Sequence, residues 1–205
     1  DSQEIYVHNL STQELLTDVF QLLGDIFGES VNYRRKIEYY RQVIKENPQL
    51  SVYATVNGGL IGGILARLTE DNQIAIHEVA VDPEFHGKGI GSKMLLQVEQ
   101  NARRLGATEI ELGGRGEVVP FYEANGFTAN LFLQGKIPPT IQNVVDLFPN
   151  YPILKATSDT ENNNEPWFRV LVETKIRNLE LEEKVKTTFP DTHLLYVFTK
   201  KIQSI

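Results

Sequence analysis

The hydrophobic and polar positions at the start of the chain predict two helices followed by a sheet. A short strand is expected at residues 5–7, and Ser11-Thr12-Gln13-Glu14 forms a capping-box pattern for a helix that ends at Gly28. A second helix is expected from Arg34 to Glu46, because its apolar residues share one face. Three β-rich runs then predict consecutive antiparallel strands, at Val52–Val56, Leu60–Leu68 and Ile74–Val81.

After residue 81 the pattern becomes an alternation of helices and strands. The residues from Ile90 to Leu105 carry the apolar stripe of a long helix that ends at Gly106. A strand, helix and strand in this order give a parallel connection, so we expect an α/β fold, of the α+β kind, with a mixed sheet. The elements expected after the long helix are a strand at Thr108–Leu112, a short helix at Val118–Ala124 and a strand at Phe127–Leu133.

The pattern changes again near Gly135, and we interpret residues 136–205 as a small C-terminal α/β extension of a main domain at 1–135. Prolines and polar residues between 138 and 165 predict irregular connections. The elements expected after them are a strand at Phe168–Glu173, a helix at Leu179–Thr187 and an apolar strand at His193–Thr199. This last strand fits either the extension itself or a pairing across a subunit boundary, so a homodimer is an open alternative.

The composition bounds the class of protein. A chain of 205 residues with 41% hydrophobic content is sufficient for a packed core. It contains no cysteine, which excludes disulfides and a cysteine nucleophile and fits a cytoplasmic location. Its apolar runs are too short to cross a membrane, and the polar residues 1–4 are not typical of a signal peptide.

The charge of the chain limits its partners. Its formal net charge of -7 disfavours nucleic acid as a partner, because phosphate binding requires a concentrated basic face. An acidic surface instead favours cationic amine substrates. The charges from Glu180 to Lys186 are interpreted as a solvated helix face. The histidines His8 and His193 have no partners at metal-ligand spacing, so we expect no metal site.

A glycine-rich turn between a strand and a helix is the strongest chemical signal in the sequence. The backbone N–H groups of a helix's first turn are unpaired and lie at the positive end of its dipole, so they favour an anionic diphosphate. Glycines at 87, 89 and 91 remove the side chains that would block it. A P-loop and a dinucleotide fingerprint do not fit, because Lys88 precedes the second glycine and the spacing is Gly-x-Gly-x-Gly.

Two motifs in this order resemble the GNAT superfamily of N-acetyltransferases. His86-Gly87-Lys88-Gly89-Ile90-Gly91 resembles its Arg/Gln-x-x-Gly-x-Gly/Ala signature, with histidine at the first position, and Val79-Ala80-Val81 resembles the end of its preceding strand. Pro120-Phe121-Tyr122-Glu123-Ala124-Asn125-Gly126-Phe127 resembles its Phe-Tyr-x-x-x-Gly-Phe segment. The resemblance covers residues 5–134 and implies a GNAT-like fold. It leaves the C-terminal extension unexplained.

The resemblance implies direct transfer of an acetyl group from acetyl-CoA to a primary amine on a small molecule or peptide. Arg115 stands where many members carry an asparagine, and it fits a cofactor phosphate, a substrate carboxylate or solvent. An acyl-CoA sensor without catalysis is the alternative function. The residues expected to bind the cofactor are Val79, Ala80, Val81, His86, Gly87, Lys88, Gly89, Ile90, Gly91, Ser92 and Arg115.

Transfer to an amine requires an acid and a base. By the resemblance Tyr122 is the general acid that protonates the leaving thiolate. The base remains open between His77, Glu78 and ordered water, with Glu111 as a more distant option. Strand alternation predicts that His77 shares a face with Val79 and Val81, whereas Glu78 faces the opposite side.

Overall fold

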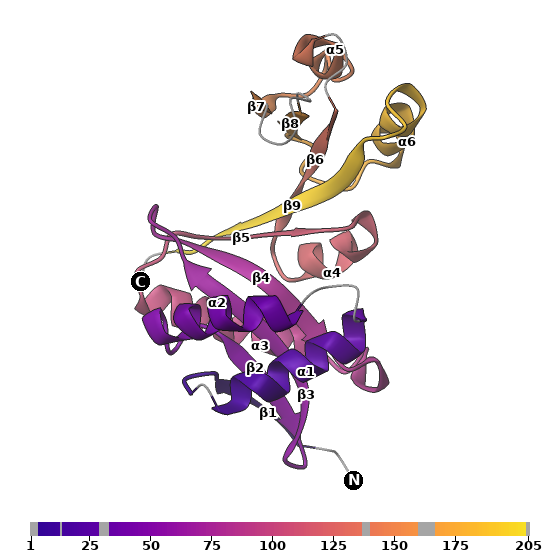
Figure 1. The fold of residues 1–205 in the computed structure, drawn as a ribbon. Coiled ribbons are helices and arrows are strands. Elements are labelled where there is room, and N and C mark those ends of the chain that lie inside the picture. Colours follow the sequence, from indigo (N-terminus) through magenta and orange to yellow (C-terminus); the bar gives the residue numbers. More distant parts are fainter. Residues whose placement is uncertain (1–3, 13, 29–32, 137–139, 160–166, 204–205) are drawn as a thin grey trace. The chain divides into compact units, whose positions relative to one another are not determined.

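The computed structural model describes residues 4–12, 14–28, 33–136, 140–159 and 167–203. It divides into two compact units (Figure 1). The first unit comprises Asp1–Glu111 with Lys201–Ile205, and the second comprises Leu112–Lys200. The division falls within one strand, β5 (Glu109–Gly114), so the chain passes between the units there and again before Lys201. The sequence-based boundary at residue 135 stays a prediction.

The first unit is an antiparallel meander with helices before and after it. The hairpin between β2 (Val52–Val56) and β3 (Gly59–Leu68) turns at Asn57 and Gly58, which have φ values of 48° and 80°. Its elements are β1 (Ile5–Asn9), α1 (Glu14–Phe27), α2 (Tyr33–Glu46), β2 (Val52–Val56), β3 (Gly59–Leu68), β4 (Gln73–Val81), η1 (Pro83–Phe85) and α3 (Ile90–Arg104). Strands β1 to β4 pair in chain order, and β4 then pairs in parallel with the start of β5. The expected mixed sheet is thereby confirmed.

Two adjacent glycines on β3 show that α1 and α3 cover opposite faces of this sheet. A Cβ added at Gly62 would lie 3.0 Å from the Met94 side chain of α3, whereas one added at Gly63 would lie 3.0 Å from Val19 of α1. Successive residues of a strand face opposite sides, so each glycine admits a different helix. The core between α1, α2 and the sheet includes Leu16, Val19, Phe20, Leu23, Tyr40, Val43, Ile44, Leu65 and Ala80.

The strand β4 has two irregular features near its middle. Leu65 of β3 lies opposite Glu78, and Ala66 lies opposite Ile76, so His77 is the extra residue of a β-bulge. The parallel ladder between β4 and β5 joins Gln73–Ala75 to Glu109–Glu111. Beyond this ladder, β4 continues for residues 76–81.

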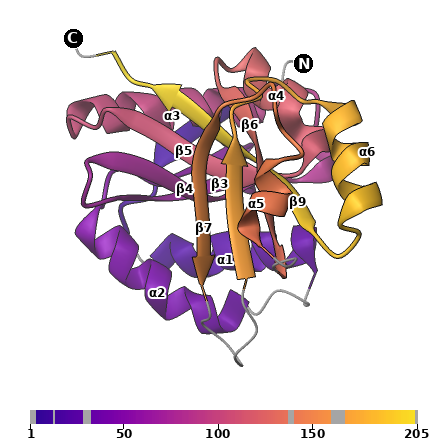
Figure 2. The ribbon, with the colours of Figure 1, turned by 90° about the horizontal axis from the view of Figure 1, so that it is seen from above.

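The second unit contains a sheet of antiparallel strands. Strand β9 (His193–Lys201) pairs with residues 128–134 of β6 (Thr128–Lys136), so the apolar C-terminal strand pairs within this chain. The segment between residues 138 and 165 was predicted to be irregular. This prediction was wrong, because the segment contains α5 (Ile141–Val145) and β7 (Ile153–Asp159). Strand β7 pairs with β8 (Trp167–Val172), although several residues of β7 are exposed. The elements are η2 (Gly116–Val118), α4 (Val119–Ala124), β6 (Thr128–Lys136), α5 (Ile141–Val145), β7 (Ile153–Asp159), β8 (Trp167–Val172), α6 (Leu179–Thr188) and β9 (His193–Lys201) (Figure 2).

The end of the described chain returns to the first unit. The N–H of Ile202 donates to the carbonyl of Thr108 at 2.9 Å, and the Ile202 side chain is buried. Both residues belong to the first unit. That unit therefore contains a segment encoded after all residues of the second unit.

The close packing at Gly62 yields a prediction about stability. A Cβ in Gly62→Ala would lie 2.9 Å from the Ala80 carbonyl oxygen, so we expect the free energy of unfolding to fall by about 1–3 kcal/mol. Gly24→Ala is the control: Gly24 lies within α1 with no atom within 4 Å of an added Cβ, and this change should stabilise by roughly 0.5–1 kcal/mol. Denaturant unfolding followed by circular dichroism measures both. Equal effects of the two changes would contradict the packing argument.

Candidate functional site

The turn between β4 and α3 is built by local hydrogen bonds and two left-handed glycines. Pro83 begins η1, and the Asp82 side chain accepts a hydrogen bond from the Glu84 N–H at 2.9 Å. Gly87 and Gly89 have φ values of 75° and 74°, which side chains with a Cβ rarely adopt. An added Cβ at either glycine would meet no atom within 4 Å. The glycines are therefore needed for backbone direction, and the space beside them is open.

The backbone N–H groups of residues 87–92 are the central feature of this turn. Among the hydrogen bonds of the described residues, none uses these groups as donors, and the first bond of α3 runs from Lys93 N to Gly89 O at 3.0 Å. Residues 86–89 are exposed, and Gly91 and Ser92 are half-buried. Unpaired amides at the positive end of a 15-residue helix form a suitable site for an anionic group.

The side chains of His86 and Lys88 each contact a neighbouring part of the turn or of β4. His86 Nε2 lies 2.8 Å from the carbonyl oxygen of Val81. Because a carbonyl only accepts, the ring must carry its proton on Nε2, and the side chain ties the turn back to the end of β4. The Lys88 ammonium lies 4.8 Å from the centre of the Phe85 ring, which keeps its positive charge beside the turn.

The bulge at His77 changes the side-chain directions on β4. Val81 lies opposite Gly62, which faces α3, and Ala80 lies opposite Gly63, which faces α1. Val79 and Val81 therefore face α3, as alternation predicts. His77 instead contacts aromatic rings of α2, on the α1 side, so the expectation that it shares a face with the valines was wrong. A single extra residue in the strand is sufficient to change the face of the sheet on which His77 lies.

The exposed residue His77 lies beside two tyrosine rings of α2 in the first unit. The ring centroid of His77 lies 5.9 Å from that of Tyr39 and 5.7 Å from that of Tyr40, in edge-to-face geometry. Tyr40 is buried, whereas Tyr39 is 47% exposed. Their contact with His77 depends on the bulge, which the sequence pattern does not reveal.

Tyr122 lies in the second unit, on α4, in an aromatic environment. Its ring stacks on Phe198 at 4.5 Å and meets Phe127 edge-on at 5.7 Å. The residue is 6% exposed, and burial raises the pKa of Tyr122 to about 12. The phenol therefore keeps its proton throughout the physiological pH range.

Arg115 also lies in the second unit, directly before η2, where its exposed side chain lines a cavity with residues of α6 and β9. The cavity includes Glu182, which the sequence analysis placed on a solvated face. This was wrong, because Glu182 is buried and bonded to Arg177 and Tyr196. Arg177 comes just before the helix and Tyr196 from β9, so helical spacing could not reveal the contact.

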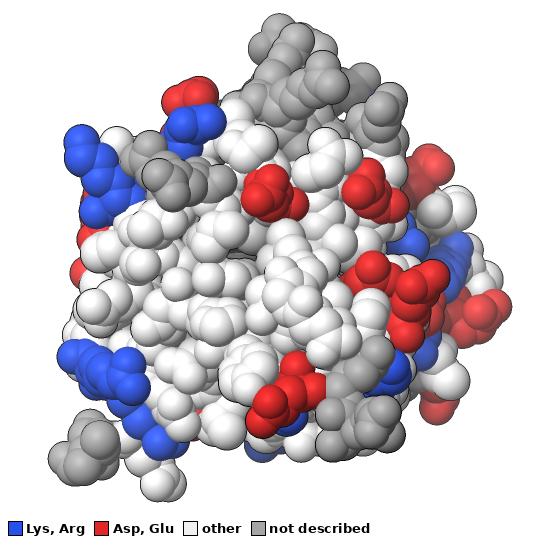
Figure 3. All heavy atoms as spheres, turned by 90° about the horizontal axis from the view of Figure 1, so that it is seen from below, with Lys and Arg blue, Asp and Glu red and all other residues white. Residues whose placement is uncertain are grey.

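The described part of the chain lacks the features of a metal site and of a membrane-spanning helix. No group of three or more histidine, aspartate or glutamate residues there is arranged to hold a metal ion. None of the described helices combines the length and apolar content needed to cross a bilayer. On the face shown in Figure 3, uncharged side chains cover much of the centre, and acidic and basic residues lie around it, next to one another on the right of the view. The described residues of this face form no continuous basic surface of the kind that binds nucleic acid.

Two solved structures share the fold of this chain. The structure of yncA from Salmonella typhimurium with its cofactor acetyl-CoA matches with a TM-score of 0.55 and 10% identity, covering 98% of this chain and 96% of that chain. Naa50 of Arabidopsis thaliana, in complex with the bisubstrate analogue CoA-Ac-MVNAL, matches with a TM-score of 0.52 and 16% identity, covering 96% of this chain and 97% of that chain. These likenesses show the fold.

The family follows from the sequence match. The model of the acetyltransferase (GNAT) family matches residues 16–127, which is more than half of the chain. The chain belongs to this family, which confirms the resemblance inferred from its motifs. An uncharacterized N-acetyltransferase of Methanocaldococcus jannaschii is 26% identical over 106 residues, covering 47% of this chain and 47% of that protein. The chain therefore matches about half the length of this relative.

The burial of Tyr122 yields a prediction about pH. The phenolate absorbance of the wild type minus that of Tyr122→Phe should show a transition near pH 12, not near the unperturbed value of about 10. Because the folded pKa lies above the unfolded one, the stability linked to this ionisation is present below about pH 10 and is lost as the pH rises through about 12. A difference transition centred near pH 10 would show that the phenol is not buried.

Proposed function

We propose that this protein is an acetyl-CoA-dependent N-acetyltransferase acting on a primary amine of a small molecule or peptide. The observation that carries the proposal is the set of unpaired N–H groups at residues 87–92. They fit the pyrophosphate of coenzyme A, because they present several donors beside two glycines with open space. Membership of the acetyltransferase family supports the same cofactor.

The residues that would hold the cofactor lie on β4 and on the turn after it. The amides of 87–92 would bind the pyrophosphate, and Lys88 would add a positive charge. The main chain of Val79, Ala80 and Val81 would pair with the pantetheine arm, which is supported by the short β4–β5 ladder that ends at Ala75. Bound acetyl-CoA supplies an acetyl group activated as a thioester. Main-chain N–H groups of β4 would donate to the carbonyl oxygen as it gains negative charge.

A base is required because an ammonium group with a pKa of about 10.4 has no lone pair at neutral pH. We place His77 first for this role, since the bulge sets it on β4 beside the aromatic rings of Tyr39 and Tyr40. Glu78, half-buried on the same strand, and ordered water are the alternatives. The base would remove one proton from the ammonium before the C–N bond forms, and the nitrogen would lose a second proton to water after this bond has formed.

Tyr122 is proposed as the acid. As the C–S bond breaks, its phenol would give a proton to the departing sulfur. With a pKa of about 12 the phenol is fully protonated at neutral pH, as this role requires. The net charge of -7 favours a cationic acceptor. The peptide-based bisubstrate analogue of Naa50 supports a peptide amine as one acceptor class.

Substitution at Gly89 tests the cofactor site. In Gly89→Ala the left-handed backbone costs about 1–2 kcal/mol, and relaxation of the turn redirects the amides. We expect binding of coenzyme A, measured by calorimetry, to weaken by about tenfold or more. Gly106→Ala is the matched control, because Gly106 has a φ of 71° and similar open space but follows the other end of α3. Equal coenzyme A affinity in both variants, or no binding to the wild type, would reject the site.

Substitution at Tyr122 tests the acid. Tyr122→Phe keeps the stacked ring, so we expect turnover to fall by about 10²–10⁴-fold with little change in coenzyme A affinity. Release of free thiol with a panel of amines measures turnover. Tyr6→Phe removes an exposed hydroxyl and serves as the control. Unchanged turnover in Tyr122→Phe would reject the role, and tight cofactor binding without thiol release by the wild type would support the sensor instead.

A further inference from the structure

A cavity of about 490 Å³ lies wholly within the second unit. It is bounded by the turn that follows β5, by α6 with the residues before it, and by the start of β9. None of the elements of the proposed cofactor turn contributes to it. It was not recognised in the sequence, because its walls come from segments far apart in the chain.

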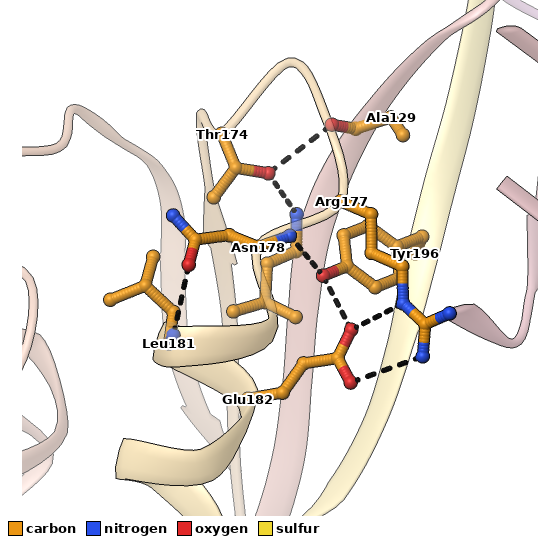
Figure 4. Close-up of polar contacts among 8 residues, drawn as sticks. Ala129, Thr174, Arg177, Asn178, Leu181, Glu182 and Tyr196 are labelled. Carbon is orange, nitrogen blue, oxygen red and sulfur yellow. Dashed lines mark hydrogen bonds and ion pairs between the residues drawn. The ribbon is translucent and has the colours of Figure 1, made fainter. Parts of the chain in front are cut away.

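One wall of the cavity is an assembled polar network. The Glu182 carboxylate, 8% exposed, accepts hydrogen bonds from Arg177 Nε at 3.0 Å and from the Tyr196 hydroxyl at 2.8 Å (Figure 4). The Tyr196 oxygen in turn accepts from the Asn178 N–H at 3.0 Å. Burial by itself would raise the pKa of Glu182, but these donors and the positive charge of Arg177 lower it overall. Glu182 is therefore a neutralised, fully bonded anion and not a free ligand group.

The Arg177 guanidinium is fixed on its other side by Gly116. An added Cβ at Gly116 would lie 2.7 Å from Arg177 Nε and 2.8 Å from its Cζ. Only a glycine permits this approach, so the guanidinium packs directly against the turn that carries Arg115. The hydrogen bonds from Arg177 to Glu182 use Nε and one terminal nitrogen.

The side chains that line the cavity carry more positive than negative charge. Arg115 and Lys186 are exposed side chains that form no ion pair or side-chain hydrogen bond with any other described residue. Three cationic side chains and two carboxylates line the cavity, which gives one net positive charge with histidine neutral. The second carboxylate, Glu117, raises the pKa of Arg177 through its charge, although the hydrogen bond to Glu182 raises it most. The site therefore has a cationic excess that an anionic ligand would neutralise.

We propose that this cavity binds a small organic anion through a carboxylate or phosphate group held by Arg115 and Lys186. A planar guanidinium and an ammonium are the groups that bind these anions best. The half-buried Leu194 and Leu195 supply an apolar wall for the rest of the ligand. Gln134 supplies a hydrogen-bonding side chain at the same cavity. The proposal is independent of acetyl transfer.

Nuclear magnetic resonance titration without coenzyme A tests the proposal on the full chain. The probes are succinate, inorganic phosphate and the neutral analogue succinamide. We expect saturable shifts of the amides of Arg115, Gly116 and Lys186 with succinate or phosphate and none with succinamide. Whichever anion binds more tightly identifies the preferred group. The double variant Arg115→Gln/Lys186→Gln should weaken that binding by at least about tenfold, because it removes both charged donors.

The control variant is Lys155→Gln, which removes one positive charge from an exposed position on β7 outside the cavity. It should keep the wild-type affinity, and all variants are compared by their unfolding midpoints. Equal binding by the double variant, equal binding of succinamide, or shifts that lie elsewhere would overturn the proposal. Coenzyme A that causes the same shifts and displaces phosphate would also overturn it, because the anion would then belong to the cofactor. Failure of acetyl transfer would leave the result unaffected.

Discussion

The proposed activity depends on the backbone amides of residues 87–92, which donate no hydrogen bond to any other described residue. A helix always begins with N–H groups that its own hydrogen bonds cannot satisfy. In this chain they lie in and after a turn with two glycines of positive φ, Gly87 and Gly89, and the space beside these two glycines is open. The bond from His86 to Val81 fixes the turn to the end of β4. This hydrogen bond joins the end of β4 to the turn before α3, so the anion site lies in line with the strand.

Much of this arrangement follows from the sequence because its determinants are local. Glycine, proline and hydrophobic spacing are sufficient to place β4, the turn and α3, since each depends on neighbours within a few residues. The direction of His77 was wrong for a physical reason. A bulge depends on the register between two strands, and β3 supplies the partner residues that define it. Periodicity within a single strand contains no information about that register.

The second unit was harder to predict because its contacts are distant in sequence. The charges around Glu182 fit an exposed helix face when only i to i+4 neighbours are considered. Burial of Glu182 requires a tyrosine from β9 and an arginine from the segment before α6, which only the folded chain brings together. Likewise β7 has a weak pattern of its own and is stabilised by pairing with β8.

The hydrogen bond from Ile202 to Thr108 has a consequence for biosynthesis. During translation the first unit emerges from the ribosome without the segment that contains Ile202, and this segment follows only after residues 112–200. During that interval the carbonyl of Thr108 lacks the hydrogen bond from the N–H of Ile202. Completion of the first unit therefore comes after synthesis of the whole second unit, whereas the meander and helices of the first unit can assemble earlier.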